Sequence, residues 1–118
     1  MILDTNALSA FVEGDESLSR VIEDDARLAV PVIALGEYLY GIRHSRFRAR
    51  YEAWVRMYLP DMDLLRVGEG TARHYAEIRS ELKAAGRPIP SNDMWIAALA
   101  REHTLPLVSR DHHFDGVP

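Results

Sequence analysis

Hydrophobic positions along the chain follow two spacings that alternate. Short apolar runs predict buried strands, and between them lie longer stretches in which apolar side chains recur every three or four residues, as on one face of a helix. The predicted strands are residues 1–4, 28–30, 62–67 and 105–109. The predicted helices are residues 6–12, a helix that begins at Asp15 or Ser17, and residues 32–42, 46–59, 70–85 and 92–103.

This alternation predicts an α/β fold in which a small parallel sheet is covered by helices on both faces. Gly14, Pro60 and Gly86 stand where the pattern requires helices to end. No repeat, linker or low-complexity segment divides the sequence, so residues 1–118 are predicted to form a single domain.

Composition narrows the possible classes of protein. With 47% hydrophobic residues in 118, the chain can build a core, and no apolar run approaches membrane-spanning length. Cysteine is absent, which excludes disulfides and thiolate metal sites, and the N-terminus lacks a signal-peptide pattern, so a cytoplasmic location is expected. The net charge of -4 argues against nucleic-acid binding, because such proteins usually carry a basic excess.

Acidic residues stand at positions where α/β proteins bind ligands. Asp4 closes the first predicted strand, Asp111 follows the last one, and Asp93 begins a helix after a proline-fixed loop. Glu37 lies within an otherwise apolar helix. Carboxylates that converge repel one another unless a cation compensates, and Mg²⁺ and Mn²⁺ prefer oxygen ligands. If these acids meet, they predict a metal-dependent phosphodiesterase.

Each acid also has a structural interpretation. Asp4 is suited to cap the first helix, and Asp93 is a first-turn acid that the helix dipole favours. Glu37 fits a solvent-facing stripe, and Asp111 fits an ordinary loop. The prediction of a metal site therefore depends on the combination of all these acids.

Segments 1–6, 32–41, 89–98 and 107–114 together resemble the PIN-domain family, and in particular the VapC-type toxins of VapBC toxin–antitoxin modules and the related FitB-like proteins. The first segment reads Met-Ile-Leu-Asp-Thr-Asn, and the segments occur in the family's order over essentially the whole chain. The resemblance implies a three-layer α/β/α fold and an endoribonuclease that depends on one or two Mg²⁺ or Mn²⁺ ions.

The resemblance also implies residue roles. By motif position, the catalytic and metal-binding acids are Asp4, Glu37, Asp93 and Asp111. Supporting roles are implied for Asn6 beside the first acid, for Ser109, where relatives often have Thr, and for Asp115, which can assist or replace Asp111. The expected reaction is phosphodiester hydrolysis without a covalent intermediate, in which Glu37 completes the metal shell or positions the attacking water.

Substrate contacts are expected mainly from Arg110 and His112, which flank Asp111. The stretch 43–56 interleaves arginines with aromatic residues, and it either grips single-stranded RNA or forms a solvated face whose aromatics lie in the core. The helices predicted at 32–42 and 46–59 carry more aromatic residues than the core of one small domain needs. This excess predicts a surface that binds a partner. By resemblance the partners are a second copy of the chain and a VapB-type antitoxin whose tail blocks the active site.

Two other functions remain open, namely a catalytically silent PIN-like binding module and a DNA-directed metal nuclease. A receiver-like phosphotransfer domain is disfavoured because the only lysine, Lys83, lies within a predicted helix. A zinc site at His112 and His113 is disfavoured because no further histidine lies at metal spacing. Without the four proposed metal-site acids the chain has 14 acidic and 14 basic residues, so the net charge is compatible with RNA binding once metal is bound.

Overall fold

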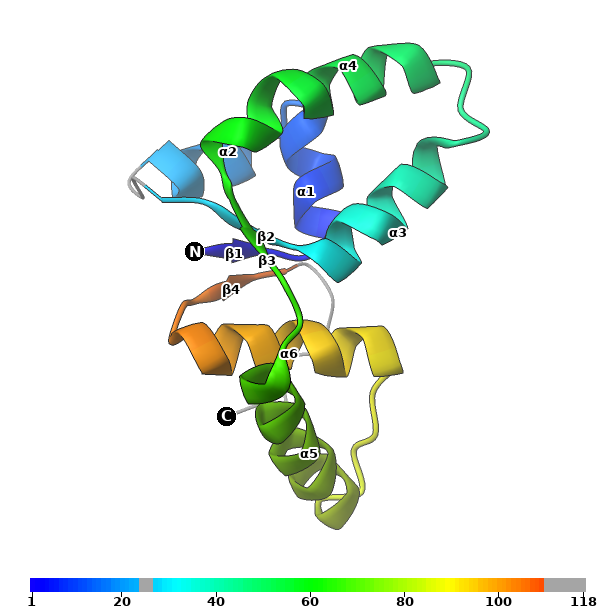
Figure 1. Cartoon of the computed structure of the whole chain (residues 1–118). Coiled ribbons are helices and arrows are strands. Elements are labelled where there is room, and N and C mark those ends of the chain that lie inside the picture. Colours follow the sequence, from blue (N-terminus) through cyan, green and yellow to red (C-terminus); the bar gives the residue numbers. More distant parts are fainter. Residues whose placement is uncertain (24–26, 110–118) are drawn as a thin grey trace.

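The computed structural model describes residues 1–23 and 27–109 and shows one parallel sheet between two layers of helices (Figure 1). The strands are β1 (Ile2–Leu3), β2 (Ala29–Pro31), β3 (Asp63–Leu65) and β4 (Leu107–Val108), in the spatial order β3–β2–β1–β4. All neighbouring strands pair in parallel. The predicted α/β fold with a central parallel sheet is therefore confirmed.

The helices divide between the two faces of the sheet (Figure 1). One face carries α1 (Thr5–Val12), α2 (Glu16–Glu23), α3 (Val32–Ile42), and α4 (Arg48–Tyr58) with the 3₁₀ turn η1 (Leu59–Asp61). The other face carries α5 (Glu69–Ala84) and α6 (Ser91–His103). Within the described ranges, no helix is long and apolar enough to cross a membrane.

Most predicted elements begin or end one or two residues away from the observed ones, and the strands predicted at 1–4 and 105–109 are only Ile2–Leu3 and Leu107–Val108. The helix predicted from residue 46 begins at Arg48, because the Ser45 hydroxyl accepts a 3.1 Å hydrogen bond from the Phe47 N–H and holds this segment in a turn. The strand predicted at 62–67 is only Asp63–Leu65, since Met62 still donates its N–H to the Leu59 carbonyl of the 3₁₀ turn.

Successive strand residues point to opposite faces of the sheet, which gives each helical layer its own core. Leu3 and Val30 are fully buried in the cluster under α1, α3 and α4. Ile2 and Ala29, their neighbours along the strands, instead pack with Leu99 of α6. The central strands β1 and β2 are thus buried on both sides, as their continuous apolar sequence predicts, whereas the edge strands β3 and β4 are only partly buried.

The chain order creates a switch point beside β1. From β1 the chain adds β2 and then β3 on one side, and after α5 and α6 it returns to place β4 on the other side. Open parallel sheets bind ligands beyond the carboxyl ends of strands at such a point. Asp4 and Ser109 directly follow β1 and β4, so both stand at this edge.

Candidate active site

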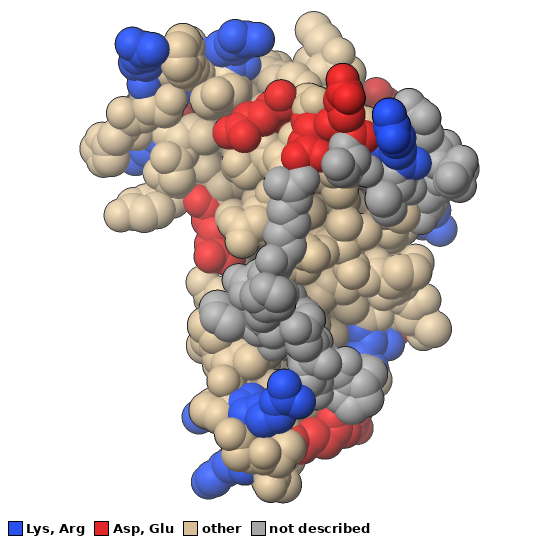
Figure 2. Space-filling view, turned by 180° about the vertical axis from the view of Figure 1, so that it is seen from behind, with Lys and Arg blue, Asp and Glu red and all other residues tan. Residues whose placement is uncertain are grey.

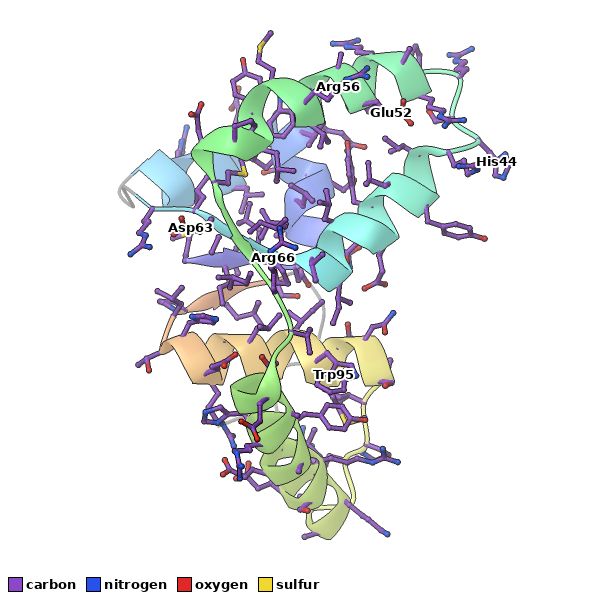
Figure 3. All side chains as sticks on the ribbon, in the orientation of Figure 1. His44, Glu52, Arg56, Asp63, Arg66 and Trp95 are labelled. Carbon is purple, nitrogen blue, oxygen red and sulfur yellow. The ribbon has the colours of Figure 1, made fainter. Side chains whose placement is uncertain are left out.

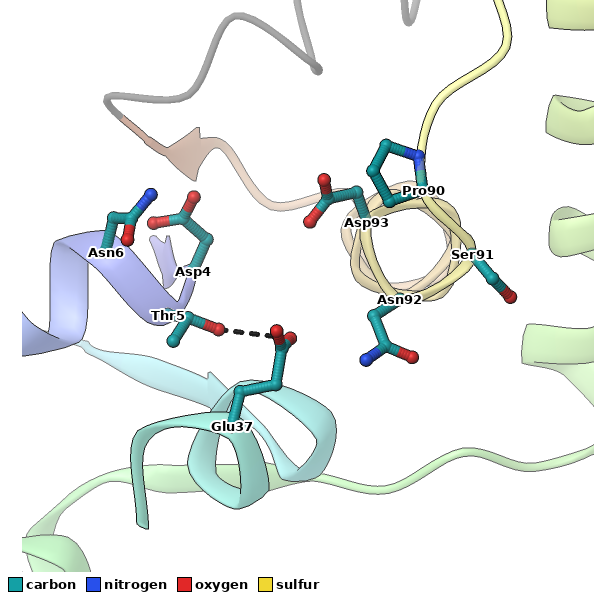
Figure 4. A pocket seen from close by; sticks show the side chains of 8 residues that line it. All are labelled: Asp4, Thr5, Asn6, Glu37, Pro90, Ser91, Asn92 and Asp93. Atoms are coloured by element: carbon teal, nitrogen blue, oxygen red, sulfur yellow. Dashed lines mark hydrogen bonds between the residues drawn. The ribbon is translucent and has the colours of Figure 1, made fainter. Parts of the chain in front are cut away.

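A cavity of about 520 Å³ opens at this edge of the sheet (Figure 4). Its walls come from the start of α1, from the middle of α3 and from the first turn of α6, so both helical layers contribute. The lining residues are Asp4, Thr5, Asn6, Glu37, Pro90, Ser91, Asn92 and Asp93. The fold therefore brings three of the four predicted acids, which are far apart in sequence, into one pocket.

Asp4 is held from two sides. Its Oδ1 accepts a 2.8 Å hydrogen bond from the Ala7 N–H and caps α1, while its Oδ2 accepts a hydrogen bond from the Ser109 hydroxyl. The residue is only 3% exposed, although it lines the pocket. The capping interpretation is thus correct and does not compete with a role in the site, because the cap fixes the carboxylate at the pocket wall.

Glu37 is half-buried and lies at the pocket rather than on a solvated stripe. Its Oε1 accepts a hydrogen bond from the Thr5 hydroxyl over 3.2 Å, which joins α3 to the first residue of α1 (Figure 4). The sequence reasoning did not select Thr5. The one signal that could have found it is its position directly after the first acid, where a helix start brings its side chain to the same edge.

Asp93 lies in the first turn of α6, as predicted, and is half-buried. The residue before the helix, Pro90, makes no side-chain cap, so this helix start lacks the capping that Asp4 gives α1. In Figure 4 the Asp93 side chain points across the cavity toward Asp4. Ser91 and Asn92 also line the pocket and were missed, because polar residues after a proline are ordinary in loops.

Several predicted site residues lie outside the described residues, namely Arg110, Asp111, His112, His113 and Asp115. Within the described ranges 1–23 and 27–109, no three Asp, Glu, His or Cys side chains lie close enough together to form a preformed metal site. Asn6 lines the pocket with an exposed side chain. The division of roles among the acids therefore stays a prediction.

Each of the two interpretations of the arginine-rich stretch 43–56 holds for some of its aromatic residues. Trp54 is partly buried against the core, where its ring meets Phe11 edge-on at 5.4 Å. Phe47 and Tyr58 are each 44% exposed. Figure 3 shows His44 in the turn after α3, and Glu52 and Arg56 on α4. The core accounts for some of the aromatics and leaves others at the surface.

Charge is unevenly distributed over the molecule. On the face shown in Figure 2, acidic side chains gather across the upper middle, whereas Lys and Arg lie at the upper corners and toward the lower end. The cavity lined by Asp4, Glu37 and Asp93 is called the acid pocket below. None of the described residues that line it carries a positive charge. A polyanionic substrate that entered this pocket would therefore need compensating cations.

The chain is similar to known proteins over most of its length. The chain matches the PIN domain family over residues 1–118. It is 33% identical to ribonuclease VapC5 of Mycobacterium tuberculosis over 116 residues, which covers 96% of this chain and 84% of that protein.

Solved structures are similar over nearly the whole chain. The DNA-bound VapBC complex of Salmonella typhimurium superposes with a TM-score of 0.87 and 27% identity, covering 99% of this chain and 91% of the other. VapBC-5 of M. tuberculosis, a member of the VapBC family of toxin–antitoxin systems, gives a TM-score of 0.74 and 31% identity, with 98% and 88% covered.

Proposed function

Because the chain belongs to the PIN-domain family and, within it, to the VapC ribonucleases, we propose that it is an endoribonuclease that hydrolyses RNA phosphodiester bonds as the toxin of a type II toxin–antitoxin system. The observation that carries the proposal is the pocket at the switch point of the sheet, which Asp4, Glu37 and Asp93 line from three different helix segments. The choice of RNA follows the relative, which is named a ribonuclease.

A divalent cation, Mg²⁺ or Mn²⁺, is part of the proposal. The donors that the pocket offers are carboxylate, amide and hydroxyl oxygens, which suit a hard cation, and the buried Asp4 carboxylate is already oriented by two hydrogen bonds. Asp4, Asp93 and Asp111 would hold one or two ions, with Glu37 as a further ligand or a base. Such an ion supplies an activated water and neutralises charge on a phosphoryl oxygen.

The protein's own residues would orient the reaction. Asp4 is fixed by its helix cap and by Ser109, so it presents a carboxylate of defined direction without an entropic cost at the moment of binding. Glu37, held by Thr5, is placed to orient or deprotonate the attacking water. Pro90 fixes the approach of the chain to α6 and thereby the position of Asp93 on the opposite wall.

Partners are proposed on the same basis. A relative of similar length is solved as a VapBC toxin–antitoxin system, which supports a VapB-type antitoxin as a partner of this chain. Large apolar side chains such as Tyr40, 75% exposed, and Met57, 69% exposed, offer surface for the antitoxin or for a second copy in a homodimer. A cytoplasmic location is part of the same proposal, because the proposed substrate is RNA.

The test is incubation of the purified chain with a total RNA pool in the presence of Mg²⁺, Mn²⁺ or EDTA, followed by mapping of the cleaved ends. A second set of tubes contains double-stranded and single-stranded DNA. The proposal predicts RNA cleavage with either metal, none with EDTA, and little cleavage of DNA. Cleavage of DNA alone would replace the proposal by a DNA nuclease, and no cleavage of either would indicate a binding module.

A further inference from the structure

An aromatic pair joins α5 to the beginning of α6, next to the acid pocket. The rings of Tyr75 and Trp95 stack with centroids 4.0 Å apart and an angle of 16° between their planes. Figure 3 shows Trp95 near the N-terminal end of α6, on the side of α5. Both rings are partly buried, so the stack fixes the Tyr75 ring and the direction of its hydroxyl.

Arg79 is one helical turn beyond Tyr75 and is held by it. Its guanidinium Nη1 donates a 3.1 Å hydrogen bond to the Tyr75 hydroxyl, and its Cζ lies 6.0 Å from the ring centroid. Within the part of the chain that the structure describes, no carboxylate lies within ion-pair distance of Arg79. Arg73 and Arg101, which also lie on α5 and α6, pair instead with Glu69 and Glu81. Arg79 is therefore exposed and oriented, and no carboxylate of the described residues pairs with it.

Ser91 connects this cation to the acid pocket. Its hydroxyl hydrogen-bonds to the Tyr75 hydroxyl and thereby lowers the pKa of Tyr75, to which the Arg79 hydrogen bond also contributes. Ser91 itself lines the pocket together with Asp93. In Figure 4 the Ser91 side chain points away from Asp4 and Glu37, toward the ribbon of α5. The Arg79 guanidinium therefore lies, through Tyr75, on the α5 side of the helix start whose other side lines the pocket.

We propose that Arg79 binds a phosphate of the RNA strand outside the acid pocket, on the α5 side of the α6 start, and that Tyr75 holds the guanidinium for this contact. The proposal rests on the proposed function, since it assumes an RNA strand in the acid pocket. A strand carries a phosphate at every nucleotide, and the described pocket residues offer only negative and neutral groups. The planar fork of an arginine suits a phosphate, and its orientation by Tyr75 reduces the entropy lost on binding.

The contact positions the strand and does not take part in bond cleavage. Loss of Arg79 should therefore raise KM and leave kcat nearly unchanged, because the contact is made equally in the ground state and the transition state. One phosphate contact also contributes about 0.7 to the slope of log affinity against log salt concentration for a single strand. A general loss of folding would not change that slope in this way.

The experiment compares Arg79→Ala, Arg79→Lys and Tyr75→Phe with a matched control, Arg73→Ala, an exposed arginine on the same helix that is paired with Glu69. Affinity for a fluorescent single-stranded RNA is measured by anisotropy with Ca²⁺ in place of the catalytic metal, at several salt concentrations, and KM and kcat are measured with Mn²⁺. Arg79→Ala is expected to weaken binding and raise KM about fivefold, and to lower the salt slope by about 0.7. Arg79→Lys and Tyr75→Phe should give smaller losses, and Arg73→Ala should behave like the parent chain.

The inference is overturned if Arg79→Ala binds RNA with the parental affinity and salt slope, if Arg73→Ala loses as much as Arg79→Ala, or if the parent chain binds no RNA with Ca²⁺ present. Because this binding needs no cleavage, its failure is separate from that of the proposed function. A chain that cleaves RNA but ignores the Arg79 substitution refutes only the phosphate contact. A chain that binds through Arg79 but never cleaves refutes only the nuclease.

Discussion

The Thr5 hydroxyl donates a hydrogen bond to Oε1 of Glu37 over 3.2 Å, and so links the start of α1 to the middle of α3 across the acid pocket. Thr5 follows Asp4, which caps the same helix, so the position of one acid determines the orientation of the other. This coupling needs no metal, and it holds the Glu37 carboxylate at the wall of the polar pocket.

Thr5→Val should lower the rate of RNA cleavage about tenfold with little effect on the free energy of unfolding, because Glu37 then loses the donor that orients it. Thr5→Ser, which keeps the hydroxyl, should restore most of the rate. The measurement is kcat over a range of pH with Mn²⁺, together with unfolding in urea. A Ser variant as slow as the Val variant would show that the methyl group, and not the hydrogen bond, matters.

Asp4 has a structural and a proposed catalytic role that substitution can separate. Asn caps helices about as well as Asp, so Asp4→Asn should remain nearly as stable as the parent while losing metal-dependent cleavage. Asp4→Ala should lose cleavage and also about 1 kcal/mol of stability. Denaturant unfolding and an RNA cleavage assay of each variant distinguish the two effects.

Asp15 provides the matched control, because its Oδ1 accepts a 3.1 Å hydrogen bond from the Leu18 N–H at the start of α2. Asp15→Ala should lose about 1 kcal/mol of stability and keep its cleavage rate below the unfolding temperature. If Asp15→Ala lost cleavage as completely as Asp4→Asn, loss of stability would explain both results, and the role of the Asp4 charge would be refuted.

Tyr38 should make the stability of the protein sensitive to high pH. Burial, with smaller contributions from Tyr51 and Glu13, raises the pKa of Tyr38 to about 12, above its ordinary value of 10.0. The neutral phenol is favoured in the folded state, so this contribution to stability is complete below pH 10 and is lost as the pH rises toward 12. Tyr38→Phe should therefore lose less stability than the parent between pH 10 and 12.

The exposed Tyr40 is the control for this titration, since its side chain is 75% exposed. Tyr40→Phe should follow the parent curve when the unfolding free energy is measured against pH. Equal curves for the parent and Tyr38→Phe would mean that the Tyr38 phenol ionises as easily in the folded chain as in the unfolded one.

Thr71 should be important for stability and unimportant for cleavage. Its buried hydroxyl donates to Oε1 of Glu102 over 2.6 Å and accepts the Gly68 N–H over 3.0 Å, which fastens α5 to α6. Thr71→Val should cost about 1–3 kcal/mol because both partners lose their hydrogen bond, whereas Thr71→Ser should cost less. Urea unfolding measures the difference, and a Val variant as stable as the parent would contradict this account.

The sequence predicted the parallel α/β fold because short, mainly apolar strands alternate with helices, and the central strands β1 and β2 are buried on both sides. It also predicted that Asp4, Glu37 and Asp93 belong together, through strand ends and family motifs. It missed Thr5, Ser91 and the pairing of Tyr75 with Arg79, because each acts through a neighbour that only the folded chain brings near. The start of α4 was misplaced because a side-chain hydrogen bond of Ser45 decides it, and this contact leaves no trace in the apolar pattern.

The most direct test of the central claim is the cleavage rate of Asp93→Asn with Mn²⁺ on an end-labelled RNA, compared with the parent and with Asp61→Asn, which removes the same charge from an exposed position. The account predicts that Asp93→Asn loses at least about a hundredfold in rate while unfolding at the same urea concentration as the parent. Asp61→Asn should cleave at the parental rate. Parental cleavage by Asp93→Asn would contradict the assignment of the acid pocket as the active site.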